Sequence, residues 1–155
     1  MRKVLASIIA VLLFFSVLPG LTLRMGIEGP SILGLSFEMD SGLCFGFGAI
    51  PPITIFGPAG PWSFSFTGGY SYSLIILHKD RMEVSALMRG CLGAIISESF
   101  SLAAVLGVLL ETKWNISPGL KAGVQLGLNL NMVQRITSPE TNFVPMGQVG
   151  LVIDF

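Results

Sequence analysis

Charge is what this sequence has least of. Only 12% of its 155 residues are Asp, Glu, Lys or Arg, whereas soluble domains carry roughly a quarter. Nine cations balance nine anions and no run of like charge occurs, so the basic surface that a nucleic-acid partner requires is missing. Hydrophobic residues make up 52% of the chain, more than so little polar surface can cover in water. We therefore expect a membrane protein without a nucleic-acid partner.

Histidine and cysteine are also scarce. The single histidine, His78, lies in the predicted turn "HKDR", where it cannot serve a Ser-His-acid site. One His and two distant Cys give no zinc spacing, so we expect no metal, no cofactor and no enzymatic activity. Cys44 and Cys91 fall on strands that are not neighbours, at different heights, which favours free thiols over the disulfide that an exported chain could also form.

A long apolar run without charge is missing after residue 20. A membrane helix needs about 20 consecutive apolar residues. The best candidate, residues 91–110, carries Ser97, Glu98 and Ser99 near its centre, where a carboxylate is most costly. A helical inner-membrane protein is therefore a disfavoured alternative.

The first twenty residues have the layout of a secretory signal peptide. Arg2 and Lys3 precede an apolar stretch that ends at Pro19-Gly20. Cleavage after Gly20 gives a signal peptide at 1–20 and a mature domain at 21–155. No Ala-x-Ala site is present, so an uncleaved anchor helix is the alternative.

A two-residue period dominates the rest of the chain. In residues 119–132 every second residue from Leu120 to Met132 is apolar, and polar residues or glycines alternate with them. A helix cannot produce this pattern, so it predicts a strand. The same alternation predicts eight strands, near residues 21–28, 33–40, 43–49, 62–76, 82–96, 100–114, 119–132 and 148–155.

The charges of these strands share one face. All ten lie on the polar parity, which predicts charges inside a barrel and apolar side chains outside it, the reverse of a soluble barrel. Short turns near 41, 78–81 and 115–119 and long loops at 51–61 and 134–145 match the asymmetry of outer-membrane barrels. The prediction is an all-β, eight-stranded antiparallel up-and-down transmembrane β-barrel. The ten residues are Arg24, Glu28, Glu38, Asp40, Glu83, Arg89, Glu111, Lys113, Lys121 and Asp154.

The terminal residues "QVGLVIDF" resemble the signal that outer-membrane barrels present to their assembly machinery. The residues that carry the resemblance are Gln148, Gly150, Ile153 and Phe155. In size and plan the mature chain is similar to the small eight-stranded bacterial outer-membrane β-barrel proteins, without indicating a subfamily. The resemblance implies a place in the bacterial outer membrane, with membrane lipid and the barrel assembly machinery as partners. We expect a monomer in which the last strand pairs with residues 21–28.

An eight-stranded barrel is just wide enough for its inner side chains or one small ligand, so a general diffusion pore is not expected. Buried charges need partners, which predicts a salt-bridged plug at the periplasmic end. Small inner residues predict a neutral cup at the outer end, unless loop 134–145 folds in and fills it. The plug residues are Arg24, Glu38, Asp40, Glu83, Arg89, Glu111, Lys113, Lys121 and Asp154, and the cup residues are Ser63, Ser65, Thr67, Gly93, Asn129 and Asn131.

These features favour a structural or small-ligand-binding barrel. The alternative is a narrow transporter or channel for small apolar or neutral solutes that enter through the cup.

Overall fold

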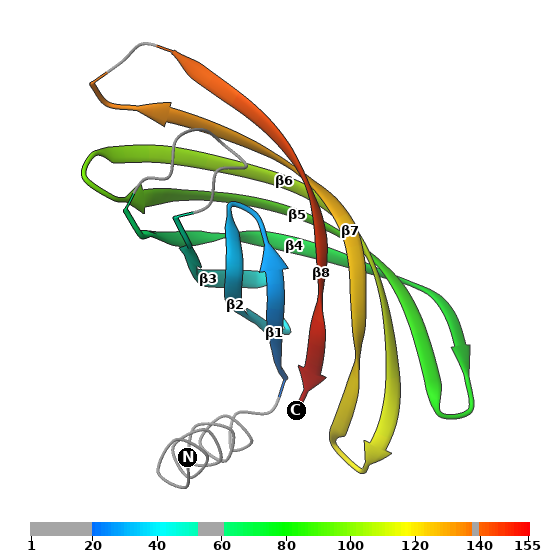
Figure 1. Ribbon diagram of the computed structural model, residues 1–155. Coiled ribbons are helices and arrows are strands. Elements are labelled where there is room, and N and C mark those ends of the chain that lie inside the picture. Colours follow the sequence, from blue (N-terminus) through cyan, green and yellow to red (C-terminus); the bar gives the residue numbers. More distant parts are fainter. Residues whose placement is uncertain (1–19, 53–60, 138–139) are drawn as a thin grey trace, which may run out of the picture.

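The computed structural model describes residues 20–52, 61–137 and 140–155, and in these ranges it is a closed antiparallel barrel of eight strands in sequence order (Figure 1). No helix in the described ranges is long and apolar enough to cross a membrane. In these ranges the all-β prediction is confirmed, and the membrane helix considered for residues 91–110 is wrong because these residues belong to two strands. The strands are β1 (Leu21–Glu28), β2 (Ser31–Met39), β3 (Leu43–Ile50), β4 (Ser63–Lys79), β5 (Met82–Ile96), β6 (Phe100–Ser117), β7 (Leu120–Arg135) and β8 (Thr141–Asp154).

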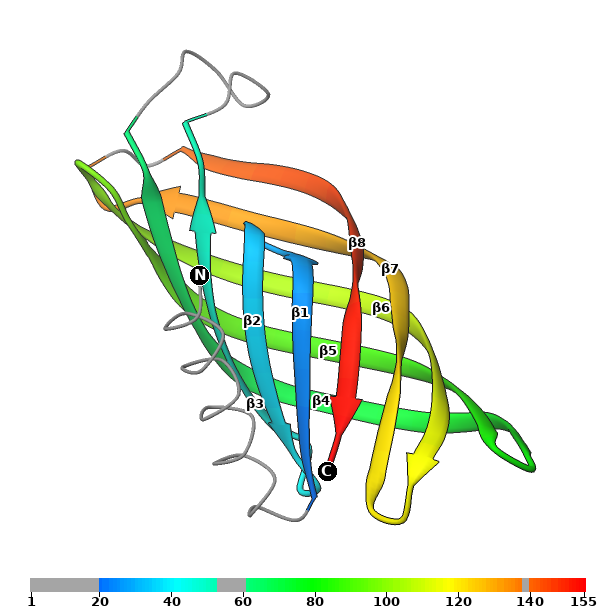
Figure 2. The same ribbon diagram turned by 60° about the horizontal axis from the view of Figure 1, so that its bottom comes forward.

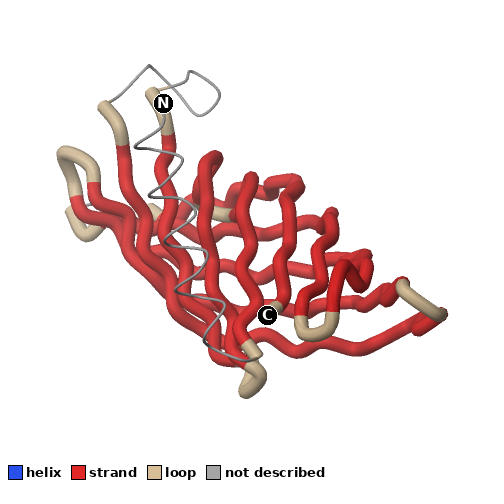
Figure 3. The backbone as a smooth tube through the Cα atoms, turned by 90° about the horizontal axis from the view of Figure 1, so that it is seen from below, coloured by secondary structure: helices blue, strands red, loops and turns tan. Residues whose placement is uncertain are grey.

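The strands arise from the alternation of side chains along each of them. In β6, Val105, Leu109 and Glu111 are buried, whereas Leu106 and Val108 are exposed. Because successive residues of a strand point to opposite faces, one parity fills the lumen and the other covers the outer surface. Viewed from below, strands account for nearly all of the described chain (Figure 3).

The polarity of the barrel is inverted relative to a soluble one. Inside, Glu111 is completely buried and Arg24 is 1% exposed, whereas on the outer surface Leu92 and Leu128 are each 72% exposed. Among the outward residues, Leu21 and Leu23 of β1 are exceptions because both are buried. The interior is therefore held by hydrogen bonds and ion pairs more than by an apolar core.

The wall of the barrel is uneven in height. We call the end that holds Gly20 and Phe155 the lower end, and the opposite end the upper end, as drawn in Figure 1. β1, β2 and β3 contain 8, 9 and 8 residues, whereas β4 to β7 contain 15 to 18. Figure 2 shows the short β1–β2 hairpin beside the longer β8. The long strands consequently extend past the short ones at both ends.

The first and last strands close the barrel, as the sequence predicted. β1 pairs with β8 from Thr22 opposite Asp154 to Ile27 opposite Val149. Phe155 continues this ladder, because its N–H donates to the Leu21 carbonyl at 3.1 Å. The seam is tight near Gly26, where a Cβ would lie 2.2 Å from the Val149 carbonyl oxygen. Glycine is therefore required there for the two strands to approach.

One loop prediction is wrong. Residues 134–145 were expected to form a long loop, but β7 runs to Arg135 and β8 begins at Thr141. Pro145 lies within β8 opposite Leu130. The N–H and C=O of Phe155 point toward β1, and because backbone groups alternate along the unbroken β7–β8 ladder, the nitrogen of Pro145 also points away from β7. β8 therefore loses no hydrogen bond to β7 at this proline.

Two strand edges are unpaired in the described part of the barrel. Pairing of β8 with β1 stops at Val149, so residues 141–148 of β8 bond to β7 alone. Pairing of β4 with β3 stops at Tyr70, although the Ser71 N–H still donates to the Gly42 carbonyl. The unpaired edge of β8 lies at the upper end and leaves a gap in the wall between β8 and β3, which we call the notch. The turn of the β1–β2 hairpin forms the bottom of the notch.

Candidate functional site

A continuous ladder of ion pairs fills the lower and middle lumen. Arg24 lies at its centre, where Nε contacts Glu111 Oε1 at 2.6 Å and Nη1 contacts Glu38 Oε2 at 2.7 Å. Above it, Arg89 approaches Glu28 at 3.6 Å and Glu38 at 3.9 Å. Each of these residues is at most 9% exposed. Each charge is therefore stabilised by its ion-pair partners and not by water.

The ladder continues downward through Lys113. Its Nζ lies 3.2 Å from Asp154 Oδ2 and 3.8 Å from both Glu111 Oε2 and Glu83 Oε1. Lys121 completes the lower end with Nζ 3.0 Å from Glu83 Oε2. Because these residues come from β1, β2, β5, β6, β7 and β8, the ladder cross-links most of the wall.

A layer of amide side chains lies above the charges. Gln125 Nε2 donates to Glu28 Oε1 at 2.9 Å, and Gln148 Nε2 donates to the same oxygen at 3.3 Å. Gln148 Oε1 in turn accepts from Asn129 Nδ2 at 2.7 Å. Asn131, which is 2% exposed, donates to the Val144 carbonyl at 3.1 Å. Polarity therefore falls from charged to neutral toward the upper end.

The upper lumen is hollow. A cavity of about 440 Å³ opens above Asn131, within the range of small-molecule sites. Its walls combine apolar side chains with hydroxyl and amide groups, and one cation, Arg135, stands at its rim. We call this cavity the cup. It is lined by Pro30, Ile50, Ser63, Ile95, Ser97, Ser99, Ser101, Asn131, Val133, Arg135, Asn142, Phe143, Val144 and Met146.

The cup borders the notch. Pro30 at the top of the β1–β2 hairpin, Ile50 at the end of β3 and Phe143 on the unpaired edge of β8 all line it. The cup therefore has a side rim as well as an upper opening. No cluster of three or more His, Cys, Asp or Glu that could bind a metal occurs in the described part of the chain.

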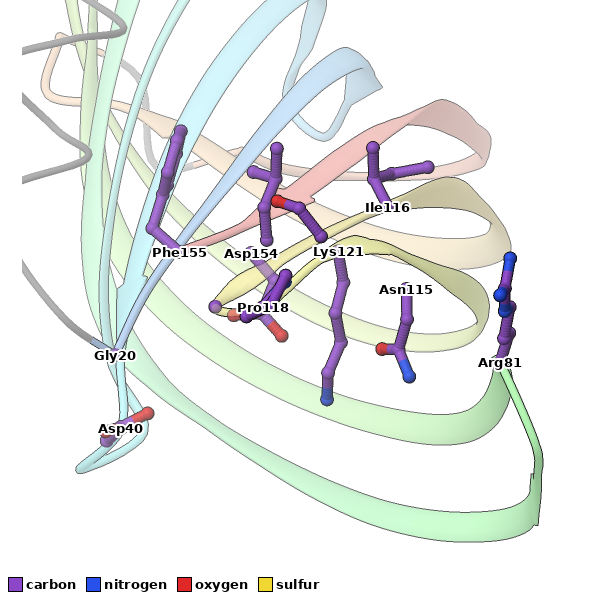
Figure 4. A pocket seen from close by; sticks show the side chains of 12 residues that line it. Gly20, Asp40, Arg81, Asn115, Ile116, Pro118, Lys121, Asp154 and Phe155 are labelled. Carbon is purple, nitrogen blue, oxygen red and sulfur yellow. The ribbon is translucent and has the colours of Figure 1, made fainter.

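A second hollow, of about 640 Å³, lies at the lower end beneath the ladder. In Figure 4 the side chains of Lys121, Asn115 and Arg81 border one side of it, and Asp40 and Phe155 border the other. It is open to the exterior and separated from the cup by the ladder and the amide layer. The two hollows share no lining residue.

The residues predicted for the plug do not all meet. Ion pairs join all the residues predicted for the plug except Asp40. Asp40 is exposed in the β2–β3 turn and forms no ion pair with the other described residues. The ladder also includes Glu28, which the predicted plug left out. Asp40 faces the lower hollow instead.

The residues predicted for the cup lie at different levels. Ser63 and Asn131 line the cavity. Ser65, 2% exposed, is hydrogen bonded to Ser31, and Thr67 lies nearby beneath the cup. Asn129 belongs to the amide layer. Gly93 does not line the cup, and it packs closely against the backbone of β4.

The two cysteines are closer than predicted. They were expected at different heights, but Cys44 Sγ and Cys91 Sγ lie 3.5 Å apart. Both residues stand opposite Gly69, Cys44 through the β3–β4 ladder and Cys91 through the β4–β5 ladder. The prediction was wrong because the alternation of a strand does not reveal its register against a neighbour.

Several lining residues were missed from the sequence. Asn142 and Val144 face the lumen from residues 134–145, which were expected to be a loop, and Met146 follows them on the same face of β8. Their alternation is hard to detect because Val144 and Met146 are apolar residues that point inward and Pro145 suggests a loop. Gln125 was also missed, although its hydrogen bond to Glu28 links the ladder to the amide layer.

Comparison with protein-family models, with curated proteins and with solved structures gave no significant match.

Proposed function

We propose that this protein is a small, monomeric outer-membrane β-barrel that holds a small neutral ligand in its cup and performs no catalysis. The observation that carries the proposal is the inverted polarity of a closed barrel. The outer surface exposes a continuous set of aliphatic and aromatic side chains, while the charges of the ladder lie inside. Water would penalise such a surface, whereas lipid accepts it.

The closure of the barrel supports a membrane location independently. A spanning structure must satisfy its backbone polar groups internally, and the closed ring of eight strands does so along each ladder, apart from the upper edge of β8 and the lower edge of β4. The apolar N-terminal segment and the terminal motif that ends at Phe155 support export and recognition by an assembly machinery.

The cup supports a binding role. Its size fits a small molecule, its walls at Ile95, Val133 and Met146 are apolar, and hydroxyl groups near its rim offer hydrogen bonds. The lumen beneath it is filled by the amide layer and the ladder, so a ligand would enter and leave on the same side.

Membrane insertion is tested by folding the full chain into lipid vesicles and into detergent micelles. A closed barrel should give a strand-type circular dichroism spectrum and a gel mobility that shifts on boiling. Sedimentation of the folded chain with the vesicles supports the proposal. A folded chain that stays in the supernatant without lipid or detergent contradicts it.

Binding in the cup is tested with N-phenyl-1-naphthylamine, a small neutral fluorophore. Val144→Trp should fill the cup and reduce saturable fluorescence at least tenfold, because Val144 lines it. Leu128→Trp adds the same side chain to the outer surface and is the matched control. Equal binding by the two variants would show that the dye reports micelles and not the cup.

The notch favours a second candidate function. A side rim formed by Pro30, Ile50 and Phe143 could pass small apolar solutes between the cup and the membrane. In this role the protein is a narrow transporter whose solutes pass through the notch and not through the lower lumen. A cross-link between cysteines introduced at Pro30 and Phe143 should stop solute entry into vesicles if the notch is the path. Unchanged entry rules out this route.

Conductance in planar bilayers distinguishes both the ligand-binding barrel and the narrow transporter from an open channel. The ladder and the amide layer obstruct the lumen, so a sealed membrane under applied voltage is expected. Stable ion currents would overturn both and favour an open pore.

A further inference from the structure

The strongest unexplained feature is the contact between Cys44 on β3 and Cys91 on β5. Their sulfur atoms lie 3.5 Å apart inside the barrel. The residues are 2% and 8% exposed, and Val105 packs with them in a small buried cluster. Two thiols with this placement serve neither the ladder nor the cup.

Strand β4 lies between the two cysteines, and its residue at their level has no side chain to separate them. In a flat sheet, strands two positions apart are separated by roughly 10 Å, too far for a disulfide. The curvature of the closed barrel turns the inward side chains of β3 and β5 toward each other. Gly69 of β4 lies between the cysteines in register and has no side chain. A Cβ at Gly69 would lie 2.9 Å from Cys91 Sγ.

Metal binding explains the pair less well. Zinc requires four ligands as a rule, and the described residues offer no group of three or more His, Cys, Asp or Glu. The carboxylates Glu28 and Glu38 already pair with Arg89, so they are not free to complete a metal site with the cysteines. A covalent bond between the sulfurs needs no third partner.

We propose that Cys44 and Cys91 form an intramolecular disulfide that joins β3 to β5 across Gly69. The two thiols lose two protons and two electrons, and a disulfide oxidant such as glutathione disulfide accepts them and becomes two thiols. One cysteine first forms a mixed disulfide with glutathione and releases one glutathione thiol. The second cysteine then attacks the protein sulfur of this mixed disulfide and releases the other glutathione thiol. The sulfurs must approach from 3.5 Å to about 2.05 Å, by side-chain rotation and a tighter bend at Gly69.

In the cell this step rests on the proposed export, because oxidising compartments preserve disulfides and the cytosol does not. Both thiols are buried in the closed barrel, so a protein oxidant reaches them while the chain is still open. The bridge ties the short strand β3 to the long strand β5 on the side of the barrel where β3 and β4 contribute no residue to the ladder.

The test uses the full chain, folded from urea into detergent micelles with reduced and oxidised glutathione. The folded product is denatured and treated with a maleimide–polyethylene glycol reagent, which adds a visible gel shift for each free thiol. The wild type should show no modified thiol without reductant and two after reduction. Cys44→Ser and Cys91→Ser should each show one modified thiol in both conditions.

Two results would overturn the bridge. One is two reactive thiols in wild-type chain that shows the heat-dependent gel shift of a folded barrel. The other is a bridge that forms only between chains, seen as a dimer on a gel without reductant. The same thiol assay on the chain recovered from cells tests separately whether the chain reaches an oxidising compartment. If the bridge forms in the glutathione experiment but the cellular chain carries two free thiols, the bridge stands and the proposed export fails.

Discussion

The lower and upper halves of the lumen are built from the same eight strands but are filled in opposite ways. Below, Arg24 and Lys113 lie buried among carboxylates, and the hollow of about 640 Å³ lies beneath them at the lower mouth. Above, neutral side chains surround a cavity of about 440 Å³. In a narrow barrel, long charged side chains meet at the axis, whereas Ser, Val and Asn do not reach it. The lower half therefore stabilises the barrel, and the upper half has room for a ligand.

The largest difference between the two ends should be seen in assembly. Deleting Phe155, whose N–H and C=O extend the closing ladder with β1, should reduce the folded fraction in cells at least tenfold. A substitution in the upper connection, such as Thr137→Ala at an exposed turn residue, should leave it nearly unchanged. The measurement is the heat-dependent gel shift of the membrane fraction. Equal folded fractions would mean that the terminal signal was misinterpreted.

The next effect is the loss of a central charge. Arg24→Met removes the nearest cation from the buried Glu38 and Glu111 and leaves them only Arg89 at 3.9 Å and Lys113 at 3.8 Å, which should cost about 3 kcal/mol of unfolding free energy. Urea unfolding of the barrel in detergent, followed by tryptophan fluorescence, measures the change. Arg135→Met removes an exposed cation at the cup rim and should change stability by less than about 0.5 kcal/mol.

A smaller loss is expected in the amide layer. Gln148→Leu removes the hydrogen bonds with Asn129 and Glu28 and leaves polar groups unsatisfied, at a cost of about 1–3 kcal/mol. The same urea titration applies, with Val149→Leu on the outer surface as the control. A cost as large as that of Arg24→Met would mean that the amides and not the charges hold the lumen together.

The smallest effect should come from the cup. Val144→Trp fills existing space and disrupts no hydrogen bond of the side chain, so we expect a change of less than about 1 kcal/mol together with the loss of dye binding. A loss of several kcal/mol would show that the cup is tightly packed in the folded protein and is no site for a ligand.

The eight strands could be predicted because apolar residues of the outer face alternate with residues of the lumen in each of them. In β7 the pattern is unbroken from Leu120 to Met132, and the structure continues the strand to Arg135. The upper half of β8 could not be predicted, because Val144 and Met146 are apolar on the inner parity. Pro145 strengthened the wrong interpretation, since a proline is acceptable in a strand only when its nitrogen needs no partner.

The inner position of a charge could be inferred from parity, but its partner could not. Glu38 and Asp40 share a parity two residues apart, yet Glu38 binds Arg24 and Asp40 is exposed beyond the end of β2. Partners depend on the stagger between strands, which a single strand does not encode. The same limit explains why the contact between Cys44 and Cys91 required the structure.

The unpaired upper edge of β8 has a consequence for aggregation. An open row of backbone donors and acceptors is a template on which another chain can add a strand. Pro145 interrupts that row because it presents no N–H where β1 no longer covers β8. Pro145 therefore removes one donor from the open row, and this loss disfavours the edge-to-edge addition of a second chain while the notch stays open.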